Sequence, residues 1–256
     1  MSAEQFERVE VYKPDPEETE ETMRFKSETQ NESFRKSALT WISLAFLIIV
    51  YPLLSIFPGE DPARILDGLN DTTRLVLFIS TMIILWTLFL LIFGAVTREQ
   101  TGLAGIGFDK IQPIHFAWAV AFLTASILIL TGVELLLAKI GLPMPGEIAL
   151  LIPQDTTGRI VWIFVSFTAG FCEEAAFRGY LMTRLRLIGN FQNWVIPTIV
   201  SAVVFGACHA YQGLPGFIVI SIYGAMFSWL YIRTGSIWPP IIAHFFQDFG
   251  ALFFPQ

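Results

Sequence analysis

Ionisable side chains inside an apolar run are the first feature of this sequence that could do chemistry. The run 171–180 carries Glu173, Glu174 and Arg178 among apolar and small residues. Neighbouring residues on a helix point about 100° apart, whereas residues four apart share a face. We therefore expect Glu174 to pair with Arg178, which leaves Glu173 without a partner on its own face. Glu173 is the candidate general acid or base, and Glu174 with Arg178 has a supporting structural role.

Two histidines and an aspartate follow in later apolar runs. His209 lies four residues after Phe205, and His244 lies four residues before Asp248, so each pair shares a helix face. Either histidine alone is as readily explained by packing or hydrogen bonding between helices. Charged groups at the centre of a bilayer cost about 2.5–3.5 kcal/mol each on insertion scales. Five titratable groups in the same third of the chain therefore predict a functional site.

The surrounding sequence is that of a membrane protein. Of its 256 residues 54% are hydrophobic and only 15% are charged, and the mean hydropathy is +0.60. A soluble domain of this size needs more polar surface to cover its core. Residues 1–38 hold 16 of the 38 charged side chains and are predicted to form a disordered acidic tail. The net charge of −6 comes mostly from this tail and says little about a nucleic-acid partner. The sequence has no basic stripe of the kind that phosphate binding requires, and the expected partner is the lipid bilayer.

Apolar runs of roughly membrane-spanning length recur after the tail. They cover residues 39–57, 75–96, 114–138, 159–182, 193–211, 216–232 and 237–254. The predicted fold class is all-α, a polytopic transmembrane helix bundle of about seven spans, with six to eight compatible with the pattern. We divide it into N-terminal transmembrane helices, 39–138, and a segment 139–256 that contains every candidate site residue.

The basic residues predict how the chain lies in the membrane. Six Lys and Arg residues precede the first run, which favours a cytoplasmic N-terminus for this multi-pass integral membrane protein. Arg184 and Arg186 are expected to be topology anchors after the fourth run. Strict alternation places Glu173 and His209 at different depths, so a helix must be broken or tilted, or one run boundary is wrong. We also predict a water-filled cavity, because irregular backbone at membrane depth needs one.

The three motifs together resemble those of a known family. Glu173-Glu174-x-x-x-Arg178, Phe205-x-x-x-His209 and His244-x-x-x-Asp248 are similar to the motifs of the CAAX-processing and bacteriocin-processing, or abortive-infection, family of intramembrane endopeptidases. The resemblance covers about 159–254, and the N-terminal helices carry no comparable signature. It implies that 139–256 is a peptidase core that hydrolyses a peptide bond of a membrane-associated peptide or protein.

The resemblance also implies roles for the individual residues. The first glutamate of the pair, Glu173, activates water; His209 assists; His244 and Asp248 stabilise the tetrahedral oxyanion. Many relatives have asparagine at the position of Asp248, and an ionised carboxylate repels an oxyanion where an amide donates to it. Asp248 could instead act when protonated, or by orienting His244.

A metal ion would give these side chains a different role. Glu173, His209, His244 and Asp248 are also an adequate ligand set for a divalent metal such as zinc, so glutamate-dependent and metallo-type hydrolysis both stay open. A non-catalytic membrane scaffold or immunity protein on the same fold is the alternative function. A proton-coupled transporter is disfavoured, because no paired halves interrupted by Gly or Pro are evident.

Overall fold

The computed structural model describes residues 34–55, 70–145 and 151–253, and within these ranges the regular structure is entirely helical. The helices are α2 (Ala38–Ala45), η1 (Phe46–Val50), α3 (Tyr51–Ser55), α5 (Asp71–Arg98), η2 (Ala104–Ile106), α6 (Pro113–Lys139), α7 (Thr156–Glu174), η4 (Ala175–Leu181), α8 (Met182–Ile188), α9 (Val195–Ala207), η5 (Ala210–Gln212), α10 (Gly213–Thr234) and α11 (Trp238–Gly250). The predicted all-α polytopic bundle is confirmed.

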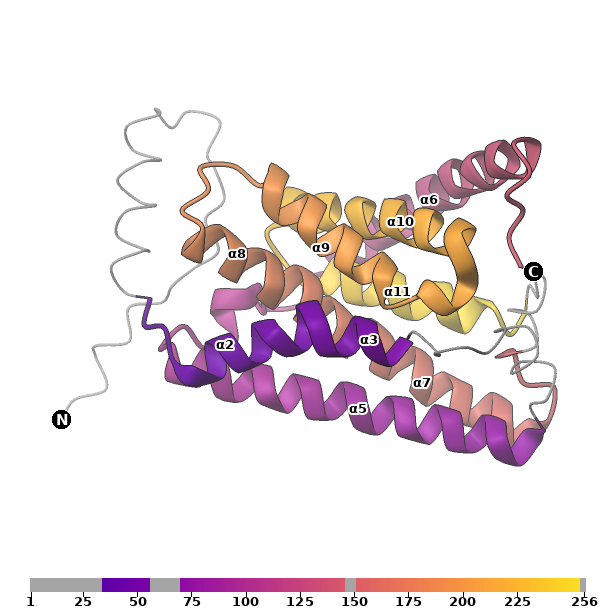
Figure 1. The fold of residues 1–256 in the computed structure, drawn as a ribbon, viewed down its shortest axis with the longest axis horizontal. Helices are drawn as coiled ribbons and strands as arrows, with labels where there is room; N and C mark the ends of the chain where they lie inside the picture. The colour runs from indigo at the N-terminus through magenta and orange to yellow at the C-terminus, as the bar shows by residue number, and fades with distance from the viewer. Residues whose placement is uncertain (1–33, 56–69, 146–150, 254–256) are drawn as a thin grey trace.

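Each predicted apolar run corresponds to a helical segment of the bundle (Figure 1). The first segment joins α2, η1 and α3, and the fourth joins α7, η4 and α8 into 33 residues. Five segments in the described ranges are long and apolar enough to cross a membrane, whereas α9 and α11 have 13 residues each. The predicted tail lies outside the described residues as far as residue 33, and the division at residue 139 stays a prediction.

The segment α7–η4–α8 is the central helix of the bundle. In an apolar stretch of 18 residues from this segment, 61% is buried inside the protein, against 17–33% in the corresponding stretches of the other four long segments. It packs against both α5 and α11. At Gly170 an added Cβ would lie 2.8 Å from the backbone nitrogen of Phe245, so α11 approaches this helix as closely as a glycine allows. The glutamate pair of this helix is therefore hidden from lipid, as its charges require.

The short α9 explains how residues in the fourth and fifth segments reach one depth. Its 13 residues span about 20 Å, less than the ~30 Å of a bilayer core. From Glu174 to Ile188 the central helix also rises by about 20 Å, and α9 then returns beside α8. The turn that follows α9 thus lies near the level of Glu174. The predicted run boundary at residue 211 is wrong, because the helix ends at Ala207. The water-filled cavity stays a prediction.

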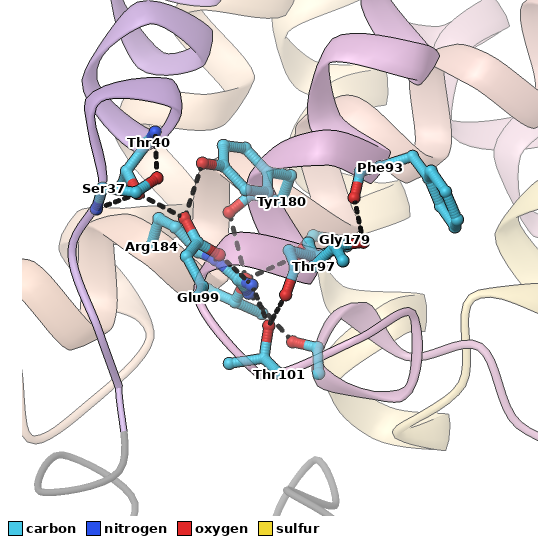
Figure 2. Close-up of polar contacts among 12 residues, drawn as sticks. Ser37, Thr40, Phe93, Thr97, Glu99, Thr101, Gly179, Tyr180 and Arg184 are labelled. Atoms are coloured by element: carbon cyan, nitrogen blue, oxygen red, sulfur yellow. Dashed lines mark hydrogen bonds and ion pairs between the residues drawn. The ribbon is translucent and has the colours of Figure 1, made fainter.

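A buried charge cluster joins the first two helical segments to the central helix (Figure 2). Glu99 accepts hydrogen bonds from Arg184 Nε at 2.9 Å and Nη2 at 2.6 Å. Its other carboxylate oxygen accepts from the hydroxyls of Thr40 at 2.7 Å and Tyr180 at 2.9 Å. Glu99 and Arg184 are both fully buried. Arg184, predicted to be a topology anchor, is therefore a buried partner of Glu99, 85 residues away in the sequence, and its part in the topology stays a prediction.

Candidate active site

A wide helical turn follows the glutamate pair. The α-helix α7 ends at Glu174, and the next seven residues, Ala175–Leu181, form the π-helix η4, in which every residue is buried. A Cβ on Gly179 would lie 2.8 Å from the carbonyl oxygen of Ile106, so the η2 turn packs directly against the backbone of η4. Short π-helical turns inside α-helices are frequent at functional sites. This one turns Arg178 into the protein core.

Glu174 and Arg178 form the ion pair that their spacing predicts. Arg178 Nη1 lies 2.7 Å from Glu174 Oε1, and both side chains are fully buried. Arg178 Nη2 donates to the Gly224 carbonyl of α10 at 3.3 Å. The guanidinium carbon lies 4.2 Å from the ring centroid of Phe205 and 5.0 Å from that of Phe227, distances typical of cation–π contacts. The pair therefore ties the central helix to α9 and α10.

His244 lies between two carboxylates. Its Nδ1 lies 2.8 Å from Glu174 Oε1, and its ring stacks on Phe227 with centroids 5.4 Å apart. A carboxylate accepts and does not donate, so Nδ1 carries a proton. The other ring nitrogen, Nε2, lies 3.6 Å from Asp248 Oδ2. Glu174 thus orients His244 as well as Arg178, a contact that the sequence does not predict.

His209 follows the end of α9 and is held by the residue four positions earlier. Its Nδ1 lies 3.0 Å from the Phe205 carbonyl oxygen, and the two ring centroids are 5.0 Å apart. The spacing Phe-x-x-x-His therefore supplies both a hydrogen-bond acceptor and a packing surface for the imidazole. Because the carbonyl accepts, the proton lies on Nδ1, and Nε2 is left with its lone pair.

The structure brings the four predicted chemical residues into one electrostatic neighbourhood. The carboxylate of Glu173 interacts electrostatically with His209, which lies between α9 and η5, and with His244 of α11. Asp248 interacts with His244 and also with Glu173. Three parts of the chain that are distant in sequence thus meet at the middle of the central helix.

The sequence does not predict that two tyrosines also lie in this neighbourhood. The Tyr51 hydroxyl donates a hydrogen bond to Glu173 Oε1 at 3.0 Å. Tyr211 of η5 lies in electrostatic range of both Glu173 and Asp248. An aromatic residue near the end of an apolar run is typical of the membrane interface, so the sequence contains no signal for either contact.

The arrangement does not form a metal site in the described part of the chain. No three His, Cys, Asp or Glu side chains there converge so that they could hold a metal ion. His209 and His244 each use Nδ1 for a protein acceptor, as metal-ligating histidines usually do, so only Nε2 of each ring could bind a metal. Because the donors of the described residues do not converge, they do not fit a bound zinc in this conformation, and we derive no step through a metal.

The class of the protein follows from the fold, the site and one comparison. The family model described as type II CAAX prenyl endopeptidase Rce1-like matches residues 155–250, which include all three motifs. This confirms the resemblance of this segment to the CAAX-processing family of intramembrane endopeptidases. A search of curated proteins and a search of solved structures found no match. With its apolar helices, the chain is an integral membrane protein; the cytoplasmic N-terminus stays a prediction.

Proposed function

We propose that the chain is an intramembrane endopeptidase in which Glu173 activates water for attack on a peptide bond of a membrane-associated peptide or protein. The observation that carries the proposal is that the His209 and His244 rings lie beside the same Phe205 ring, with centroids 5.0 and 6.2 Å from it, and that both interact electrostatically with Glu173. Among the described residues the ion pair of Arg178 is with Glu174 and not with Glu173. The Glu173 carboxylate is therefore available for proton transfer.

The reaction follows from these groups. Glu173 accepts a proton from water as the water oxygen bonds to the carbonyl carbon, and the carbonyl electron pair moves to oxygen. The tetrahedral intermediate then collapses, the C–N bond breaks, and Glu173 returns the proton to the leaving amine. His209 Nε2, with the ring fixed through Nδ1, accepts the second hydrogen bond of the water and orients its lone pair.

His244 supplies the group that meets the developing oxyanion. Glu174 and Asp248 flank the imidazole on its two nitrogen sides, and two carboxylates compensate an imidazolium charge. The protonated Nε2 is then a donor for the oxyanion, the kind of contact worth about 10²–10³ in rate. In this arrangement Asp248 acts through His244, which accounts for a carboxylate where many relatives have an amide.

Replacing Glu173 by Gln tests the proposal, because the amide has the same shape and cannot take the proton. The membrane proteome of cells with Glu173→Gln is compared with that of wild-type cells. We expect uncleaved precursors to accumulate in the variant. Glu134→Gln is the matched control in α6, and no precursor should accumulate there. A Glu173→Gln protein that elutes normally in detergent and leaves no precursor uncleaved contradicts the proposed function.

A further inference from the structure

The first helical segment, which lies outside the family-matched residues, reaches the candidate site. Tyr51, at the start of α3, donates its hydroxyl to Glu173 Oε1 at 3.0 Å across 122 residues of sequence. Its ring lies 6.2 Å from that of Phe177, centroid to centroid, in the π-helical turn of the central helix. Leu47, one turn earlier, is fully buried. This face of the segment is therefore packed against the site.

Two further hydroxyls fix the same segment at its ends. Ser55 Oγ lies 2.8 Å from the carbonyl oxygen of Ala207, the last residue of α9 and two residues before His209. At the other end Thr40 donates to Glu99 at 2.7 Å. The segment is thus attached to Glu99 of the buried charge cluster, to Glu173 and to the turn that carries His209.

The local backbone presents Tyr51 to the site. Proline at position 52 has no N–H, and its ring would clash with the carbonyl four residues earlier in a regular α-helix. The π-helical turn Phe46–Val50 lies directly before Tyr51 and widens the helix there. Such turns relieve the clash and change the direction of the residues that follow. Two π-helical turns, η1 and η4, therefore flank the contact between Tyr51 and Glu173.

We infer, building on the proposed function, that Tyr51 is a positioning residue for Glu173, supplied by the N-terminal helices. Its O–H holds Oε1 and leaves Oε2 to take the proton from water. In the described part of the chain the other titratable or charged groups that interact electrostatically with Glu173 come from its own helix, the end of α9, η5 and α11. They are Cys172, Arg178, Cys208, His209, Tyr211, His244 and Asp248. The working unit of the enzyme therefore extends beyond the family-matched segment.

Tyr51→Phe tests this inference because it deletes one oxygen atom and keeps the ring. The assay measures cleavage of the precursor that accumulates with Glu173→Gln, in purified membranes over a pH series. We expect kcat to fall about tenfold, the equivalent of one hydrogen bond to a charged group, with KM unchanged. Because this hydrogen bond holds the carboxylate that takes the proton from water, we also expect the shape of the pH profile to differ from that of the wild type.

Two control variants separate positioning from structure. Tyr231→Phe removes another buried tyrosine hydroxyl, one that has no hydrogen-bond partner among the described residues, and should behave as wild type. Ser55→Ala loosens the segment without touching Tyr51, and should lower activity equally at every pH. If Tyr51→Phe keeps the wild-type pH profile, or loses activity equally at every pH as Ser55→Ala does, the inference about Tyr51 is overturned. The proposed function is unaffected by that result. Full activity of Glu173→Gln overturns the proposed function itself.

Discussion

Replacing Glu99 by Gln should destabilise the protein far more than an ordinary polar substitution. The amide can turn its oxygen toward Arg184, and the hydroxyls of Thr40 and Tyr180 can rotate to accept from its nitrogen. Most hydrogen bonds therefore survive, and the charge is what is lost. Arg184 is fully buried, and removing one partner of a buried ion pair costs about 3–5 kcal/mol. We expect a loss of this size in the free energy of unfolding.

The double variant Glu99→Leu with Arg184→Met separates charge from packing. Well-packed apolar residues often replace a buried ion pair at little cost. Here the hydroxyls of Thr40 and Tyr180 would lose their acceptor, at about 1 kcal/mol each. We therefore expect the double variant to lose less than the sum of the single variants, with a coupling energy of about 2–3 kcal/mol.

Reversible unfolding in mixed detergent–SDS micelles, followed by tryptophan fluorescence, measures these differences. Asp71→Asn is the matched control, because it breaks the 2.8 Å pair with Arg74 at a carboxylate side chain that is 71% exposed. Exposed pairs contribute about 0–1 kcal/mol. A Glu99→Gln protein within about 1 kcal/mol of the wild type, or strict additivity in the double variant, would refute the reasoning.

Three further predictions concern the site. Gly170→Ala places a Cβ 2.8 Å from Phe245 N and displaces α11, so it should slow precursor cleavage by up to about 10²-fold. Gly132→Ala is the control, because its Cβ would lie in open space, and it should cleave at the wild-type rate. Equal rates for the two variants would contradict the close packing of α11 on the central helix. Asp248→Asn loses the charge that compensates the His244 imidazolium but gains an amide that can itself donate to the oxyanion, so it should cleave precursor within about tenfold of wild type. Asp248→Leu offers neither group and should lose about 10²–10³; an inactive Asn variant would disprove that Asp248 acts at the oxyanion. Incubation with a chelator should leave cleavage unchanged, because the described donors do not converge; loss of activity that zinc restores would establish a metallo-type mechanism.

Contacts within one helix are the part of the site that the sequence could predict. Glu174 with Arg178, Phe205 with His209, and His244 with Asp248 are all four residues apart and lie close in the structure. The 3.6-residue period of the helix decides these contacts before any packing is known. The apolar runs likewise predict where helices occur, because the bilayer demands continuous apolar length.

Contacts between different helices could not be predicted from the sequence. His244 lies 70 residues from Glu174, and Tyr51 lies 122 residues from Glu173, so no periodicity relates them. Each contact depends on which helix faces lie together. The end of α9 could not be predicted either, because the apolar run continues past Ala207 and hydropathy does not indicate where the chain turns.

The short α9 has a consequence for how a cell makes this protein. A helix of 13 residues is too short to be held by lipid alone. The backbone groups of the turn after it would face hydrocarbon without protein around them. During synthesis α9 therefore has to leave the insertion machinery together with α10, against which it packs, and under cover of the central helix. His209 joins the glutamate pair only when the helices associate, so on the proposed function a freshly inserted chain is expected to be inactive.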